Sequence, residues 1–132
     1  MSVFTEPEIE FLRSQRLARI ATASPTGQPD VSPVTFGLDD DCLVSGGFDI
    51  TKTVRYKHLL ANPRATMVID ELVTVDPWQP RGLKVRGAAT IEDDGSGRLS
   101  IRIRPAVIWS WGINATAVAN PGAIEKRVVD DA

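Results

Sequence analysis

Hydrophobic and polar residues alternate along several short segments of the chain, as in β-strands with one buried face. These segments are residues 16–24, 29–38, 42–46, 64–69, 82–92, 100–104 and 105–114. Turn-forming residues, such as Ser24-Pro25-Thr26-Gly27 and the run 92–98, separate them. Short strands at this spacing predict a mainly β fold, a closed barrel of six or seven antiparallel strands.

Two helices interrupt the strands. Thr5 and Glu8 form the sequence pattern of a capping box, which predicts a helix that ends near Gln15. A second helix is expected to begin at Asp49 or Thr51 and to end at Asn62, the residue before a proline. Nothing splits residues 1–132 into domains, and residues 115–132 are expected to form a loosely ordered tail.

Three details of the pattern leave alternatives open. Pro33 within a strand predicts a sheet edge or a bulge, where no ladder bond is needed. Trp78 stands between two prolines on a predicted projecting loop, where it is either a core plug or a contact to a ligand or partner. Trp109 and Trp111 share one strand face, either in the core or at a dimer surface.

Composition excludes several functions. With 132 residues, 42% of them hydrophobic, the chain can bury one core. A net charge of −2 argues against general nucleic-acid binding. Cys42 and His58 are the only cysteine and histidine, so neither a disulfide framework, a thiolate metal site nor an acid–base constellation is evident. No apolar run reaches transmembrane length and no signal-peptide pattern is present, which favours the cytoplasm.

The segment 45–64 carries the most chemistry. Gly46 and Gly47 allow the backbone to approach a ligand closely. A helix start follows, and its free N–H groups attract anions. The basic residues of this segment have no acid between residues 50 and 64; they are Lys52, Arg55, Lys57 and Arg64. Lys52 and Arg55 are expected to share a helix face. The segment therefore predicts a phosphate site, with a solvated basic helix face as an equally open alternative.

The pattern SGGxDxxKTxxYxxxxxNPR over residues 45–64 resembles the pyridoxamine 5′-phosphate oxidase-like split β-barrel superfamily. The segments VDPWQPRGLKVRG and SIRIRPAVIWSWGIN are similar to small actinobacterial members that are assigned as enzymes dependent on the deazaflavin coenzyme F420. The resemblance extends from the N-terminal helix to about Asn114. It implies an FMN-binding split barrel and a homodimer with two cofactor sites at the interface. The C-terminal segment of true pyridoxamine phosphate oxidases is missing, which argues against B6 chemistry.

The resemblance also implies which residues bind the cofactor. Lys52, Thr53 and Arg55 match the region that grips the phosphate. The strand under the ring and the end of the next strand correspond to Ser32, Pro33, Val34, Thr35, Ser45 and Gly46. Trp78 and Lys84 match a region that reaches the partner's site.

Three hypotheses follow from these observations. The first is a reductase that uses coenzyme F420, transferring a hydride between the deazaflavin and a small-molecule substrate. The second is an FMN-binding oxidoreductase on the same barrel. The third is a non-catalytic binder of flavin, deazaflavin or haem, with haem least favoured because His58 is the only histidine.

Overall fold

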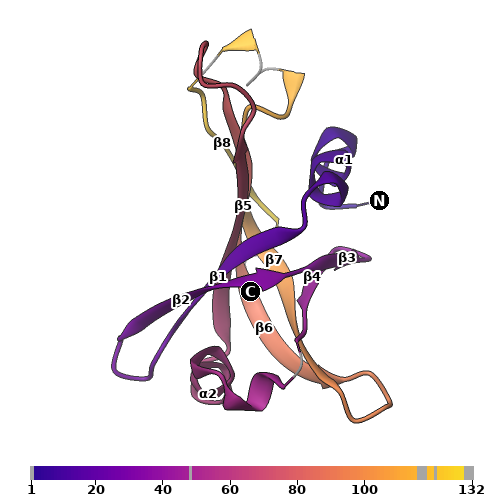
Figure 1. Ribbon diagram of the computed structural model, residues 1–132, viewed down its shortest axis with the longest axis vertical. Helices are drawn as coiled ribbons and strands as arrows, with labels where there is room; N and C mark the ends of the chain where they lie inside the picture. Colours follow the sequence, from indigo (N-terminus) through magenta and orange to yellow (C-terminus); the bar gives the residue numbers. More distant parts are fainter. Residues whose placement is uncertain (1, 48, 116–118, 121, 130–132) are drawn as a thin grey trace.

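The computed structural model describes all residues except 1, 48, 116–118, 121 and 130–132 (Figure 1). Its helices are α1 (Glu6–Ser14), the short 3-10 helix η1 (Ile50–Lys52) and α2 (Val54–Ala61). Its strands are β1 (Leu17–Ala23), β2 (Pro29–Thr35), β3 (Gly37–Asp39), β4 (Cys42–Ser45), β5 (Arg64–Leu72), β6 (Pro80–Asp93), β7 (Leu99–Trp111) and β8 (Glu125–Val128).

The strands form one antiparallel sheet that curves into a split barrel. Within the described part of the chain the order is β2-β1-β5-β6-β7-β4-β3, and β8 adds to β7. Only Phe36 separates β2 from β3, so the two ends of this path are neighbours in the chain. No ladder among the described strands joins them, and the closed barrel that strand spacing predicts is therefore wrong. The split barrel, with its two flanking helices, is confirmed.

The core lies on the inner face of the sheet, where alternate residues of the strands are buried. Residues that point inward from the three long central strands are 0–1% exposed; they are Met67, Ile69, Leu83, Val85, Ile101, Ile103 and Ile108. Pro33 lies on β2, an edge strand of the sheet, which is where a proline within a strand is usually found. The edge position expected for this proline is confirmed.

One long strand replaces the two that the sequence predicts over residues 100–114. Pro105 lies within β7, opposite a register shift between Arg86 and Gly87 of β6. A Cβ atom at Gly87 would lie 1.8 Å from the Arg104 carbonyl oxygen, so only glycine fits this bulge. Trp109 and Trp111 are half-buried on the outer face of β7, while Ile108 and Ser110 point into the core.

The β5–β6 hairpin projects from the barrel and forms the upper end of the molecule, whereas α2 lies at the lower end (Figure 1). The connection 73–79 contains Trp78, which is 66% exposed and is therefore not a core plug. Residues 125–128, predicted as part of a loose tail, instead form β8 and pair with residues 107–110 of β7. Among the described helices, none has the length and apolar character needed to cross a membrane.

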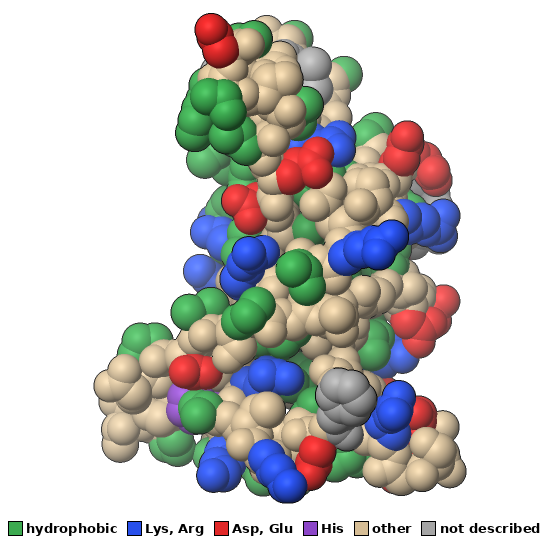
Figure 2. Space-filling view, in the orientation of Figure 1, with side chains coloured by type: hydrophobic (Ala, Val, Ile, Leu, Met, Phe, Trp, Pro, Cys, Tyr) green, Lys and Arg blue, Asp and Glu red, His purple; other side chains and the backbone are tan. Residues whose placement is uncertain are grey.

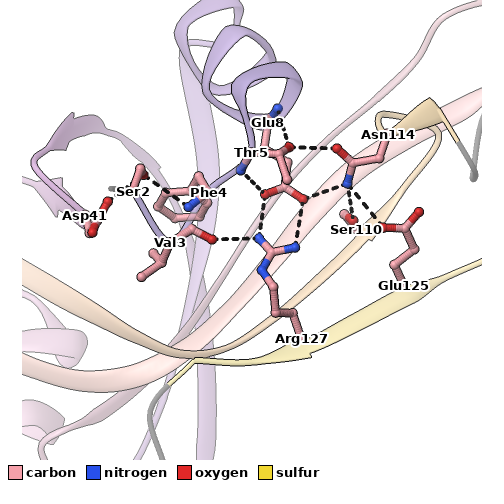
Figure 3. Close-up of polar contacts among 10 residues, drawn as sticks. All are labelled: Ser2, Val3, Phe4, Thr5, Glu8, Asp41, Ser110, Asn114, Glu125 and Arg127. Carbon is pink, nitrogen blue, oxygen red and sulfur yellow. Dashed lines mark hydrogen bonds and ion pairs between the residues drawn. The ribbon is translucent and has the colours of Figure 1, made fainter.

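The N-terminal capping box is confirmed, and it belongs to a larger buried network (Figure 3). The Thr5 hydroxyl oxygen accepts from the Glu8 amide at 3.2 Å, and the Glu8 carboxylate accepts from the Thr5 amide at 2.9 Å. Arg127 of β8 donates to the same carboxylate at 2.6 Å, and Asn114 donates to it at 2.9 Å. Glu8 is fully buried, so this network fixes both α1 and β8 against the barrel.

Candidate functional site

The phosphate candidate lies where β4 leads through Gly46 and Gly47 into two short helical pieces. Asp49 caps η1 by accepting from the Thr51 amide at 3.0 Å. Thr53 has extended backbone angles and caps α2, accepting from the Tyr56 amide at 3.3 Å. The single helix that the sequence predicts to begin at Asp49 or Thr51 is thus broken at Thr53.

This break separates Lys52 from Arg55. Lys52 ends η1, and Arg55 is the second residue of α2, so the prediction that they share one helix face is wrong. They stay close in sequence, on either side of the residue that caps α2. The first-turn N–H groups of α2 add partial positive charge to the two cations, because a helix N-terminus attracts anions. The break makes a cationic helix start rather than a basic helix face.

Arg55 has an unusual environment. Its Nε atom is buried, and it is the one buried side-chain nitrogen or oxygen of the described residues that has no hydrogen-bond partner. A Cβ atom at Gly47 would lie 3.9 Å from Arg55 Nη2, so the guanidinium lies beside a residue that has no side chain. A buried donor without a partner costs about 1–3 kcal/mol. Such a group is expected where a ligand completes the hydrogen bonding.

The surrounding electrostatics also favour an anion. Figure 2 shows Lys and Arg side chains gathered at the lower end of the molecule, over η1 and α2. In the described part of the chain neither Lys52 nor Arg55 takes part in an ion pair. Asp49 is the nearest acid in sequence, and hydrogen bonds from Thr51 lower the pKa of its carboxyl group. The Asp49 carboxylate is therefore engaged by Thr51 at the start of η1.

The residues expected under a cofactor ring lie on β2 and β4. Pro33 and Thr35 are exposed on the outer face of β2, Ser32 is half-buried, and Val34 points into the core. Ser45 is 1% exposed, and its hydroxyl donates to the Thr35 carbonyl at 2.8 Å. This bond ties the end of β4 to the end of β2. Because the Ser45 hydroxyl is already bonded within the fold, any contact from Ser45 to a ligand would come from its backbone.

A hollow of the surface was not predicted from the sequence. It is a shallow groove of about 830 Å³ on the outer face of β1, β5 and β6, at the end of α2. Thr22 lines it, and its hydroxyl lies 2.9 Å from His58 Nδ1. Arg64 and Arg86 also line the groove and make it basic. Sequence reasoning missed Thr22 because only the packing of α2 on β1 brings it to His58.

Trp78 and Lys84 lie apart from the phosphate candidate. The connection that carries Trp78 is at the end of the molecule opposite to α2 (Figure 1). Lys84 is half-buried on β6, with its Nζ atom 4.2 Å from the centre of the Trp109 ring. One chain therefore does not bring Trp78 to Arg55. A shared site would need Trp78 from a second copy, as the resemblance implies.

Comparison with known proteins identifies the family to which the chain belongs. Residues 5–122 match the family described as pyridoxamine 5′-phosphate oxidase, and the chain belongs to that family. A reductase of 5a,11a-dehydrotetracycline and 5a,11a-dehydrooxytetracycline from Streptomyces rimosus is 30% identical over 119 residues. The match covers 83% of this chain and 84% of that protein.

Solved structures share the fold at lower identity. A conserved hypothetical protein from Mycobacterium tuberculosis superposes with a TM-score of 0.69 at 20% identity, covering 92% of this chain and 91% of that one. An FAD-binding protein from Mesorhizobium loti gives 0.62 at 21%, covering 76% and 86%. A haem-binding protein from Mycobacterium smegmatis gives 0.72 at 18%; the match covers 95% of this chain but only 58% of that one. Relatives with one fold thus differ in ligand, and the ligand must be argued from the site.

Proposed function

We propose that this protein is a reductase that binds coenzyme F420 and transfers a hydride between the deazaflavin and a small organic substrate. The observation that carries the proposal is the unpartnered Arg55 Nε beside Gly47, at a cationic helix start. The reductase from Streptomyces rimosus, which aligns with most of the chain, supports the reaction class. A non-catalytic binder would share the site but would reduce no acceptor.

The residues present fit such a cofactor. Arg55, Lys52 and the amides of the first turn of α2 would hold its phosphate through charge-assisted hydrogen bonds. Pro33 and Thr35 are exposed on β2, where a ring is expected, and their strand is tied to β4 by Ser45. A reduced deazaflavin supplies the hydride, so the chain needs no activated nucleophile. Its own part is to bind, orient and shield the ring.

We also propose that the working unit is a homodimer. The projecting β5–β6 connection exposes apolar side chains that a monomer leaves in water; they are Leu72, Val73, Val75 and Trp78, each 40–70% exposed. Figure 2 shows hydrophobic side chains grouped at this upper end. An apolar group on a projecting arm is typical of an interaction surface. In a dimer the arm of one copy would be free to reach the other copy's site.

The test is a titration of the purified protein with F420 and, separately, with FMN, followed by quenching of tryptophan fluorescence. Replacing Lys52 and Arg55 together by alanine should raise the Kd by more than about tenfold, because charge-assisted bonds contribute roughly 1.5–3 kcal/mol each. Lys57→Ala is the matched control, an exposed lysine removed from the same helix. Sedimentation velocity on the same samples measures the assembly state.

The outcomes separate the hypotheses. Selective F420 binding that is lost in the double variant, followed by reduction of an acceptor, supports the proposal. Selective FMN binding would instead support the second hypothesis, in which the same site binds a flavin and not the deazaflavin. Unchanged affinity in the double variant would exclude the phosphate site, and a monomer at working concentration would exclude the dimer.

A further inference from the structure

The groove of about 830 Å³ on the outer face of β1, β5 and β6 is built by an irregularity of the sheet. The β1–β5 ladder ends at the pair Ala21–Thr66, although both strands continue beyond it. Asn62, which follows α2, bridges the separated strands by donating from its side-chain amide to the Ala23 carbonyl at 3.3 Å. The hollow therefore lies where two strands of one sheet move apart.

The floor of the groove is apolar and carries small side chains. Alanine and glycine make up half of the described residues that line it. Ala21 and Ala88 point outward from β1 and β6, and Gly87 lies at the bulge where no Cβ atom fits. Neighbouring strands lie about 4.8 Å apart, so the floor from β1 to β6 is about 10 Å wide. That width accepts the face of a fused two-ring or three-ring system lying across the strands.

Polar side chains stand at the rim of this floor. Arg64 and Arg86 are exposed and line the groove. Thr66 pairs with Arg86 across the β5–β6 ladder, and Arg64 lies two residues from Thr66, so the two arginines are diagonal neighbours on the outer face. A guanidinium binds both oxygens of a carboxylate and also stacks on aromatic rings. The rim therefore favours an anionic group at the edge of a planar ring.

The turn after α2 forms a fixed wall at one end of the groove. Asn62 is bonded to β1, and the Pro63 carbonyl accepts from the Ala89 amide of β6 at 3.0 Å. The turn is thus held on both sides. A wall that is already ordered loses little conformational freedom when a ligand binds.

The groove also extends toward the strand on which the proposed function expects the cofactor ring. Ala21 pairs with Val31, and two residues along the same strands Arg19 pairs with Pro33. Alternate residues of a strand share a face, so Ala21 and Pro33 both belong to the outer face of the β1–β2 pair. The groove and the expected ring strand are therefore neighbours on one surface.

We propose that this groove binds the acceptor substrate, as a planar aromatic or polycyclic compound that carries a carboxylate or another anionic oxygen group. Arg64 binds the anionic group, and the alanine and glycine floor holds the face of the ring. The role of the groove as the acceptor site rests on the proposed function. Binding of such a compound by the groove does not.

The test uses 2-naphthoate and its neutral counterpart 2-naphthalenemethanol, titrated by calorimetry into the full chain without any coenzyme. We expect 2-naphthoate to bind saturably, and at least about tenfold more tightly than the alcohol, because only the carboxylate makes charge-assisted bonds to Arg64. Arg64→Gln should remove this preference. Arg98→Gln is the matched control, the same change in the exposed β6–β7 turn, and should keep the preference.

A second pair of variants tests the floor. Ala88→Phe places a ring in the groove and should raise the Kd of both compounds at least about tenfold. Thr90→Phe adds the same ring at the next exposed position on that face of β6 and should leave both Kd values unchanged. Thermal unfolding shows whether each variant is folded, and Ala88→Leu gives a milder filling if Ala88→Phe is not.

The outcomes separate this proposal from the proposed function. No saturable binding, or unchanged Kd values in both Ala88 variants, would overturn the groove as a site, even if F420 binds. Equal affinity for the acid and the alcohol would overturn the anionic class of ligand. If 2-naphthoate does not bind and Ala88→Phe dissociates a dimer in sedimentation velocity, the face is an interface between copies and the proposal fails. Binding of 2-naphthoate without binding of F420 would keep the groove and remove the reductase.

Discussion

Two partly buried arginines, Arg55 of α2 and Arg127 of β8, have opposite surroundings. Arg127 donates to the Glu8 carboxylate at 2.6 Å and to the Val3 carbonyl at 2.8 Å. Arg55 lies beside Gly47 with a buried Nε atom that has no partner. The first arginine is satisfied by the fold itself. The second has a side-chain nitrogen with no partner among the described residues, which is why we propose the site at Arg55 and give Arg127 a structural role.

The contrast extends to neighbouring groups. Around Arg127, the polar atoms of Thr5, Glu8 and Asn114 bond to one another (Figure 3). Around Arg55, the bonds of Thr53 and Asp49 to other described residues go to nearby backbone and to Thr51, and they shape the two helix starts. A completed network stabilises one structure, and an incomplete one indicates binding.

The largest effect on stability is expected at the buried Glu8–Arg127 ion pair. Glu8→Ala removes the buried carboxylate and leaves Arg127 and Asn114 without their acceptor, so the free energy of unfolding should fall by roughly 3 kcal/mol. Urea denaturation measures it. Arg55→Ala is the matched comparison, because it removes a cation that forms no ion pair with any acid among the described residues. If Arg55→Ala lowered the free energy of unfolding as much as Glu8→Ala does, Arg55 would be structural like Arg127, and the proposed difference between the two arginines would be wrong.

The pH dependence of stability should follow Glu8. Burial acts to raise the pKa of its carboxyl group, but hydrogen bonds from Arg127, Thr5 and Asn114 outweigh burial and lower it below the ordinary value of 4.5. A carboxyl with a lowered pKa contributes stability above its unfolded pKa, and this contribution disappears as the pH falls through the folded pKa. Denaturation measured as the pH is lowered from about 6 through and below the ordinary range of a glutamate carboxyl group should therefore show a steeper loss of stability in the wild type than in Glu8→Gln. Equal slopes would exclude Glu8 as the source.

The smallest effect is expected at Arg55. Arg55→Met keeps much of the side-chain volume and removes the unpartnered donor, so unfolding free energy should change by less than about 0.5 kcal/mol or rise. Cofactor affinity should fall in the same variant. Thermal unfolding and the F420 titration, made on one preparation, measure both quantities. Clear destabilisation would mean that Arg55 has a structural role.

Local sequence predicted several parts of the fold. The capping box at Thr5 and Glu8 and the position of Pro33 on an edge strand are confirmed. Each depends on residues within one turn or one strand. The predictions that failed concern longer pieces: one helix became η1 and α2, two strands became β7, and part of a loose tail became β8.

The candidate site was predicted in part for the same reason. The basic residues and glycines of segment 45–64 predict a phosphate site from sequence, and the structure adds the buried Nε of Arg55. The sequence could not show that Thr53 separates Lys52 from Arg55, because the choice between capping residues depends on how β4 enters the helix. Nor could it show Thr22 beside His58, since that contact joins β1 to α2.

The sequence by itself determined the strand alternation, the two helical regions, the acidic net charge and the cationic segment, because these depend on neighbouring residues. Tertiary structure decided which distant residues meet. Glu8 and Arg127 are 119 residues apart and form one ion pair. Lys84, Trp109 and Lys126 are aligned by the registers of three strands. Register is set by long-range pairing and by the bulge at Gly87, so no local pattern specifies it.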